Sequence, residues 1–189
     1  MERYPRTLTH GDSQLRLDPT RLLVAFEDEE TEREKAAEFL KRFDLRLEDG
    51  SQAPDVPGTL PRDIVNHAGG RYWARADEPI SENLLEEFEN IDEVDWVAPA
   101  YQDPKADRSH VAPLPFVLLV RFRNEEARRS IEDEFDLNRD DERSEYLNPF
   151  SYYELRNEDD EGDRPTAIQL RDRLDGVEEV TETQFELMP

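Results

Sequence analysis

The sequence predicts an α+β protein made of two tandem βαββαβ units, because the 189-residue chain repeats one order of signals twice. Each half opens with an apolar run, Leu-Leu-Val-x-Phe, at residues 22–26 and again at 118–122. An acidic helical segment that ends in Phe-Asp-Leu follows, and each half closes on a Val-x-x-Val run. In this order each unit is ferredoxin-like: a four-stranded antiparallel sheet with two helices on one face.

The first half begins with a strand over 21–27, where apolar side chains on both faces suit a central position in a sheet. Thr31 and Glu34 fit a capping box, and the apolar residues after them recur at helical spacing. This pattern predicts a helix over 31–43. A loop rich in Pro and Gly then leads to a second strand that begins near residues 63–65.

The Gly-Gly pair at 69–70 predicts a hairpin-type turn into a third strand over 71–76. Ser81 marks the start of a second helix, which carries a stripe of Leu, Phe and Ile at helical spacing. Residues 93–98 are expected to form the fourth strand, which Pro99 ends.

The second half predicts the same elements in the same order. Its first helix has Asn124 as a good N-cap, and its second helix begins at Pro165 and ends at Gly176. Its four strands are expected over 116–122, 143–147, 151–156 and 177–185.

The expected domain boundaries follow from these elements. They are a flexible leader over 1–17, a first unit over 18–101, a Pro-rich linker over 102–115 and a second unit over 116–189.

The chain is strongly acidic, with a formal net charge of −24 from 48 acidic and 24 basic residues, of which only Lys35, Lys41 and Lys105 are lysines. Such a composition is typical of salt-adapted, halophilic proteins, because self-repulsion destabilises the compact state unless salt screens it. The absence of a basic patch argues against nucleic acid and anionic membranes as partners. An acidic DNA mimic is the rival interpretation, and the even spread of the acids over both halves disfavours it.

The sequence contains no credible catalytic set, so we expect a protein that is not an enzyme and needs no cofactor. There is no cysteine, no nucleophile elbow and no Gly-rich phosphate loop. His10, His67 and His110 are scattered and have no metal-ligand spacing.

The N-terminal residues are polar and carry no apolar signal segment, so a cytoplasmic location is expected. The location would be extracellular if the chain were a fragment of a larger precursor.

The segment over 84–101 resembles the end of a subtilisin-family (subtilase) prodomain, in which a helix is followed by a strand and a tail. Val94, Val97, Pro99 and Tyr101 match that pattern, and the run over 22–26 fits the usual first strand. The second half matches more weakly, through Gly-Val-Glu-Glu-Val at 176–180.

The resemblance implies a non-enzymatic binding protein that inhibits a subtilisin-like serine protease, assists its folding, or both. In that family the open sheet face packs on the enzyme and the tail lies in the substrate cleft as an added extended strand. The tail residues carried over here are Ala98, Pro99, Ala100, Tyr101, Phe185, Glu186, Leu187 and Met188. The candidate sheet-face residues are the aromatics Tyr72, Trp73, Trp96, Tyr152 and Tyr153.

An alternative function is a structural or regulatory module in which paired ferredoxin-like domains bind a protein or a small ligand. Fold alone does not decide between these functions. A ligand-sized pocket with convergent polar groups would favour the second.

Overall fold

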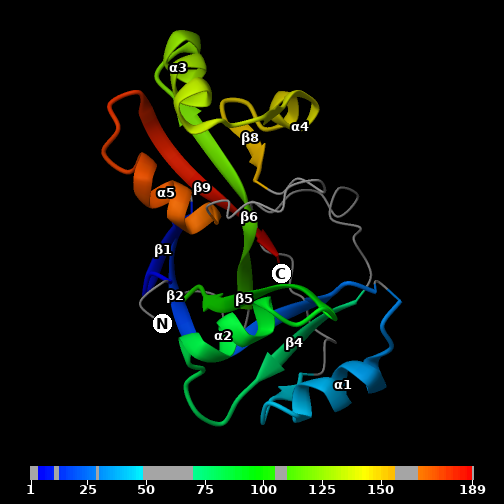
Figure 1. The fold of residues 1–189 in the computed structure, drawn as a ribbon. Helices are drawn as coiled ribbons and strands as arrows, with labels where there is room; N and C mark the ends of the chain where they lie inside the picture. Colours follow the sequence, from blue (N-terminus) through cyan, green and yellow to red (C-terminus); the bar gives the residue numbers. More distant parts are fainter. Residues whose placement is uncertain are drawn as a thin grey trace. The chain divides into compact units, whose positions relative to one another are not determined.

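A computed structural model describes residues 4–10, 13–28, 30–48, 70–104, 110–155 and 166–188 (Figure 1). Within these residues the fold is α+β, with five helices and a mostly antiparallel sheet, which confirms the predicted class. The chain divides into two compact units, Met1–Pro113 with Leu187–Pro189, and Leu114–Glu186.

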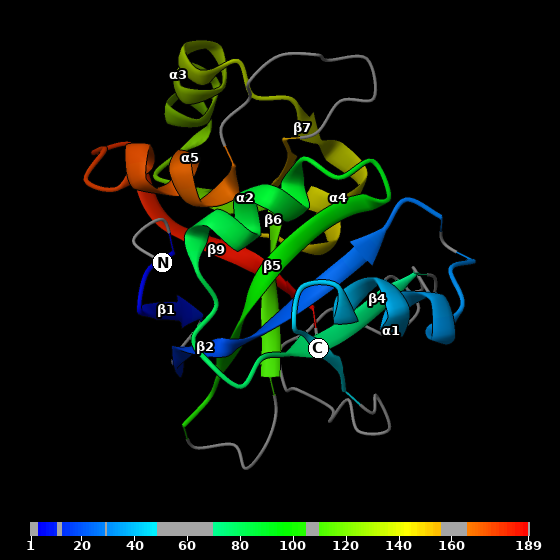
Figure 2. The same cartoon turned by 60° about the horizontal axis from the view of Figure 1, so that its bottom comes forward.

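The first unit contains a sheet with α1 and α2 on one of its faces (Figure 2). Its elements are β1 Thr7–His10, β2 Ser13–Phe26, α1 Arg33–Lys41, β3 Arg46–Leu47, β4 Arg71–Arg75, α2 Glu82–Glu89 and β5 Val94–Gln102. The strand order is β3-β4-β2-β5, so the long β2 is central, and β1 also pairs with β2.

Aromatic rings join the two helices of the first unit to the sheet. The ring of Phe39 in α1 lies 5.2 Å from that of Phe26 in β2 and 5.6 Å from that of Phe88 in α2. Phe43 completes the cluster at 4.8 Å from Phe88. Burial of each such ring stabilises the fold by about 1.5–3 kcal/mol, and the edge-to-face geometry adds to that.

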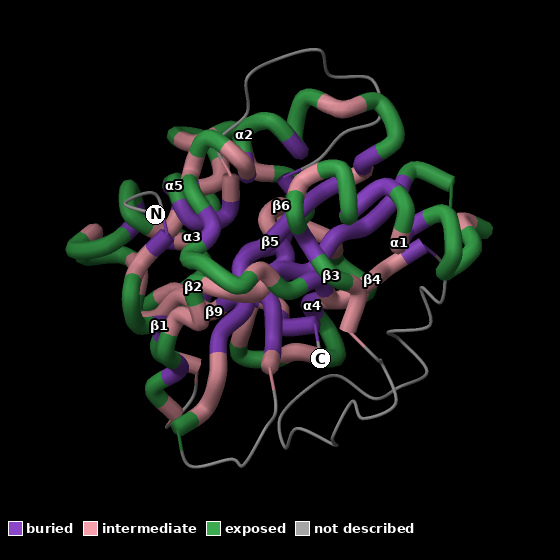
Figure 3. Tube along the Cα trace, turned by 90° about the horizontal axis from the view of Figure 1, so that it is seen from below, coloured by how far each residue is buried: buried purple, intermediate pink, exposed green. Residues whose placement is uncertain are grey.

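The second unit repeats the arrangement with one additional helix. Its elements are β6 His110–Phe122 from Leu114 onward, α3 Glu125–Phe135, β7 Arg139–Asp140, α4 Asp141–Tyr146, β8 Ser151–Glu154, α5 Ala167–Leu174 and β9 Val180–Met188 as far as Glu186. The strand order is β7-β8-β6-β9, with β6 central. Figure 3 shows that the buried residues follow the strands, while the exposed ones lie mostly in the helices and in the turns that join the elements.

In the described residues the strands form one nine-stranded sheet, where the sequence predicts two separate sheets. The reason is the length of β6. Its start pairs with β5, Tyr101 opposite Val111, and its residues 117–120 pair with β8.

Two expected boundaries differ from the structure. Residues 7–17 are not a free leader: β1 and the start of β2 form a hairpin in which Leu8 and Leu15 are paired and buried. The expected linker also contributes to strands, because Gln102 belongs to β5 and β6 begins at His110. Burial of the isolated leucines Leu8 and Leu15 stabilises a hairpin whose short sequence carries no strong periodic signal.

The prediction of a strand over 143–147 is wrong, because residues 141–146 form the helix α4. The carboxylate of Asp140 accepts a 2.8 Å hydrogen bond from the backbone N–H of Arg143 and caps this helix. The expected strand at 63–65, the first glycine of the 69–70 turn, residue 156 and Pro165 lie outside the described residues.

Candidate functional site

The aromatics predicted for the open sheet face of the first unit lie on two opposite faces. The Tyr72 hydroxyl donates a 2.5 Å hydrogen bond to the Thr31 carbonyl, and its ring lies 6.0 Å from that of Phe26. Tyr72 therefore faces α1. Trp73, the next residue of β4, points to the other side, as strand alternation requires.

Trp73 and Trp96 share the face that points away from α1 and α2. They pair with Leu23 and Ala25 respectively, which alternate on the same side of β2. The Arg71 guanidinium lies 5.7 Å from the centre of the Trp96 ring, a cation–π distance. Trp96 is only 5% exposed, whereas Trp73 is half-buried. Of the three predicted residues in this unit, Trp73 is thus the accessible one on that face.

A polar cluster lies beside Trp73, at a bulge in β2. Asp18 pairs with Ala100 and Leu22 pairs with Pro99, so the residues between Asp18 and Leu22 form an irregularity in the ladder. The Asp18 carboxylate accepts hydrogen bonds from the Thr20 N–H at 2.9 Å and the Thr20 hydroxyl at 2.7 Å. These contacts fix the bulge as a local Asx turn.

The charged and titratable side chains of this cluster come from β2, from the residue after β3 and from the start of β6. Arg21 lies 2.7 Å from Asp18, 2.8 Å from Glu48 and 2.9 Å from Nε2 of His110. Burial lowers the pKa of His110, and the Arg21 cation lowers it further, which outweighs the attraction of Asp18. Burial alone would raise the pKa of Asp18, but hydrogen bonds from Thr20 and Arg21 lower it below its usual value.

Tyr152 and Tyr153 of the second unit are fully buried and also face opposite sides. The Tyr153 hydroxyl donates a 2.8 Å hydrogen bond to Glu132 in α3. The Tyr152 hydroxyl donates to Glu186 at 3.0 Å and accepts a hydrogen bond from Arg143 in α4. Burial raises the pKa of both phenols, and the carboxylates raise it further. Both rings hold the unit together rather than presenting a surface.

The two predicted tails are strand residues, which corrects the expectation that they extend away from the fold. Ala98 and Ala100 lie in β5, paired with Leu23 and Asp18, and both are fully buried, while Pro99 beside them is buried as well. The Tyr101 hydroxyl donates a 2.9 Å hydrogen bond to the carbonyl of Pro5. The N-terminal segment thus anchors this residue, and no pattern in the sequence indicates that contact.

The second predicted tail lies in β9. Phe185 is 2% exposed and lies 5.5 Å below the guanidinium of Arg171. Glu186 accepts the hydrogen bond from Tyr152, and Leu187 and Met188 are buried.

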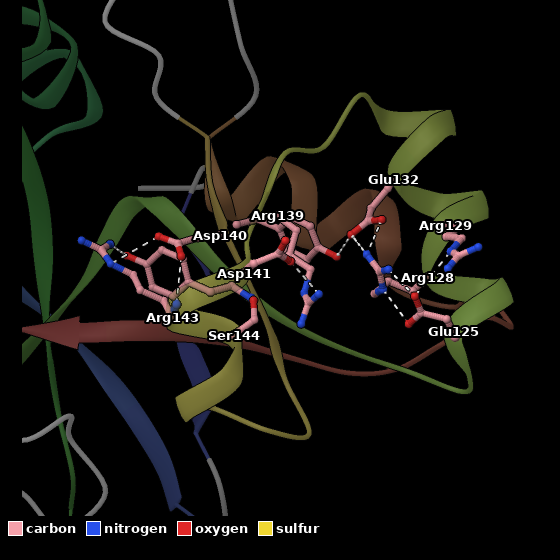
Figure 4. Close-up of polar contacts among 11 residues, drawn as sticks. Glu125, Arg128, Arg129, Glu132, Arg139, Asp140, Asp141, Arg143 and Ser144 are labelled. Atoms are coloured by element: carbon pink, nitrogen blue, oxygen red, sulfur yellow. Dashed lines mark hydrogen bonds and ion pairs between the residues drawn. The ribbon is translucent and has the colours of Figure 1, made fainter.

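A polar pocket of about 580 Å³ lies in the second unit. It lies where the start of α3, the start of α4 and the turn over 148–151 meet. Its charged lining residues are Glu125, Arg128, Arg139, Asp141 and Glu145, and Figure 4 shows four of them. Phe122, Pro149 and Phe150 supply its apolar surface.

Arg128 is fixed on one wall of the pocket by two carboxylates. Glu125 accepts from its Nε at 2.9 Å and from its Nη2, and Glu132 accepts from its Nη1 (Figure 4). Hydrogen bonding by Arg128 lowers the pKa of Glu125 to about 2, and hydrogen bonding to Glu125 raises the pKa of Arg128. Because all three nitrogens are engaged, Arg128 shapes the wall and has little capacity for a ligand.

Arg139 is held less completely. Its Nη1 donates to Asp141 at 2.7 Å, and the side chain of Asp141 is 85% exposed. Its Nε is buried and has no hydrogen-bond partner in the described part of the chain. A buried donor without a partner costs free energy, so an acceptor brought by a ligand would stabilise it.

Sequence reasoning missed this pocket because its walls come from elements that meet only in the folded chain, although all its lining residues lie between positions 122 and 151. One wall of the pocket could be predicted from the sequence, because Glu125, Arg128 and Glu132 have the spacing of ion pairs on a helix. The remainder depends on α4, which the sequence predicts as a strand.

Among the described residues, no group of three or more His, Asp or Glu side chains is arranged to hold a metal ion. In the same residues no helix is both long enough and apolar enough to span a membrane. Comparison with protein-family models, with curated proteins and with solved structures found no match for this chain.

Proposed function

We propose that the chain is a non-enzymatic binding protein built of two ferredoxin-like units, and that it acts on a subtilisin-like serine protease as an inhibitor or folding chaperone. The single observation that carries this proposal is the strand order of the first unit. Numbered by their place in a βαββαβ unit, β3, β4, β2 and β5 are strands 2, 3, 1 and 4, the ferredoxin-like order. The prodomain-like segment over 84–101 spans α2 and β5 of this unit.

The second unit supports the same reading of the fold. Its strands β7, β8, β6 and β9 follow the order 2, 3, 1 and 4, and α4 is an addition between β7 and β8. The two units therefore agree in topology as well as in sequence pattern.

The placement of the tails changes the binding mode that we propose. Residues 98–101 and 185–188 are paired and mostly buried, so inserting them into a cleft would require each strand to leave its sheet. Loss of the buried contacts of Phe185 and Leu187 alone would cost several kcal/mol, at about 1.5–3 kcal/mol for each side chain. We therefore place the protease contact at Trp73, the accessible aromatic of a face on which Leu23, Ala25 and Trp96 are buried.

The experiment is a titration of a subtilisin-like protease with the purified chain in high salt, with hydrolysis of a peptide substrate as the readout. We expect tight inhibition that weakens on the order of tenfold or more in Trp73→Ala, because buried aromatic anchors dominate such interfaces. Tyr72→Phe is the matched control: it changes the adjacent residue on the α1 side and removes only the hydroxyl that bonds to Thr31.

Absence of inhibition, with digestion of the chain, would reject the proposal. Equal loss in both variants would instead reject the Trp73 face as the contact. Truncation after Gln184 is a poor test, because it removes the buried Phe185 and Leu187 and so perturbs the fold.

A second candidate function, a module that binds a small ligand, is favoured by the polar pocket of the second unit. It is compatible with the first, because Trp73 and the pocket residues belong to different units.

A further inference from the structure

The pocket of the second unit presents charges of both signs to the same space. Two arginines and three carboxylates line a volume of about 580 Å³, within the range of roughly 300–1,000 Å³ that small-molecule sites occupy. All of its lining residues belong to Leu114–Glu186, so the site is complete within one unit.

Arg139 is the cation available to a ligand. Arg128 is saturated by Glu125 and Glu132, whereas Arg139 is paired with the exposed Asp141 and its Nε has no hydrogen-bond partner in the described chain. Its side chain is 29% exposed and can turn toward an incoming group. A carboxylate fits best, because the planar guanidinium pairs with it through two parallel hydrogen bonds.

The carboxylates of the pocket determine what else the ligand must carry. Asp141 and Glu145 are exposed on α4, close in sequence to the site that Arg139 offers. They would repel a polyanion such as phosphate, and the net charge of −24 strengthens that repulsion. An ammonium group on the ligand would pair with them and make the ligand neutral overall.

The apolar part of the wall completes the description of the ligand. Phe122 and Phe150 are partly buried and flank the polar groups, so they can cover a short apolar side chain. A molecule with one carboxylate, one ammonium and a modest apolar group matches all three features.

We propose that this pocket binds a small zwitterion of the α-amino-acid class, with its carboxylate on Arg139 and its ammonium on the acidic side chains of α4. This inference rests on the second candidate function, ligand binding by the second unit, and is independent of protease binding.

The test measures thermal shift and calorimetric binding of the twenty L-amino acids in a salt concentration that keeps the chain folded. Each active amino acid is compared with two relatives: the carboxylic acid without the amino group, and the amine without the carboxylate. Arg139→Gln removes the anchor, and Arg129→Gln is the matched control. Arg129 lies in the same unit, is 72% exposed and does not line the pocket, although it forms a 3.4 Å ion pair with the lining residue Glu125. The control therefore removes one positive charge near the pocket and leaves Arg139 in place.

We expect at least one apolar amino acid to bind, and Arg139→Gln to weaken it roughly tenfold to a hundredfold while Arg129→Gln does not. Both relatives that lack one charge should bind more weakly than the zwitterion. Glu145→Gln should weaken binding of the amino acid and leave binding of the carboxylic acid unchanged. The melting temperature of each variant without ligand shows whether it has folded, and Arg139→Lys, which keeps the charge, should retain partial binding if Arg139→Gln is unstable.

Three results overturn the inference, and they separate it from the function on which it rests. If the carboxylic acid or the amine alone binds as tightly and loses affinity in Arg139→Gln, the pocket binds a ligand but the zwitterion class is wrong. If the amino acid binds equally well to Arg139→Gln, the site is elsewhere. If none of these molecules binds, both the inference and the small-ligand function of the second unit fall.

Discussion

Nε2 of His110 lies 3.1 Å from Oδ2 of Asp18, although 92 positions separate them in the chain. Arg21 joins the two: its Nη1 is 2.7 Å from that carboxylate oxygen and 2.9 Å from the ring nitrogen. A guanidinium can only donate and a carboxylate can only accept, so the tautomer of the ring decides whether Nε2 accepts from Arg21 or donates to Asp18. The bulge in β2 brings the three side chains together.

Asp18 is expected to be the most sensitive residue of this cluster. Asp18→Ala removes the acceptor of both Thr20 hydrogen bonds and leaves Arg21 with Glu48 as its remaining carboxylate in this cluster. The expected loss in the free energy of unfolding is about 1–3 kcal/mol, because partly buried donors are left unpaired. Denaturant unfolding in high salt measures it. Asp18→Asn should lose less, since its amide oxygen can still accept from Thr20, and an equal loss in both variants would contradict this account.

The stability of the chain is expected to depend on the protonation of His110. The folded-state pKa of His110 is lower than its ordinary value of 6.5, so the unfolded chain takes up the proton first as the pH falls. The free energy of unfolding therefore decreases as the pH drops below about 6.5 and through the folded-state pKa. Above that range this group contributes no pH dependence. The pKa of Asp18 is itself lowered, so Asp18 stays ionised throughout this window.

Denaturant unfolding followed from about pH 8 to about pH 5 measures this dependence. His110→Gln should flatten the curve, because glutamine keeps a polar side chain and does not titrate. A wild-type curve as flat as that of the variant would show that His110 is not responsible.

The helix caps separate what the sequence predicts well from what it does not. Thr166 caps α5 through a reciprocal capping box with Gln169, whereas the capping box expected at Thr31 is absent, because α1 begins one residue later with Glu32 as its N-cap. Thr166→Ala should lower the free energy of unfolding by about 1 kcal/mol, and Thr31→Ala should lower it much less. Equilibrium unfolding of the two variants makes this comparison, and similar losses would mean that the Thr31 hydroxyl stabilises α1 in another way.

The elements that were predicted correctly are those with long apolar patterns or strong caps. The central strands at 22–26 and 118–122 carry continuous apolar runs, and both are buried on both faces over most of their length. Asn124 was predicted as an N-cap, and its side chain accepts a 2.8 Å hydrogen bond from Ala127. Local chemistry was sufficient at these places.

The sequence was insufficient wherever tertiary contacts decide the structure. Ser144 accepts a hydrogen bond from the Tyr152 backbone and so fixes the short polar helix α4 against β8. The buried Tyr101 depends on Pro5, 96 residues away. The first contact joins two elements only eight positions apart and the second joins distant parts of the chain, and neither leaves a periodic signal in the sequence. They explain why the pocket and the paired state of the predicted tails could not be predicted.

Salt is expected to stabilise the whole chain. A net charge of −24 repels itself, and screening becomes effective as the Debye length shortens from about 10 Å at 0.1 M salt to about 3 Å at 1 M. The melting temperature should therefore rise steadily from low to molar KCl, as differential scanning fluorimetry can measure. A matched variant tests whether net charge is the cause. It neutralises four exposed helix positions by Glu86→Gln, Glu87→Gln, Asp133→Asn and Glu134→Gln, and so changes the net charge from −24 to −20. The melting temperature of that variant should fall less when the salt concentration is lowered, because its charges repel one another less. A melting temperature that is independent of salt in both proteins would refute the salt-adapted interpretation of the surface.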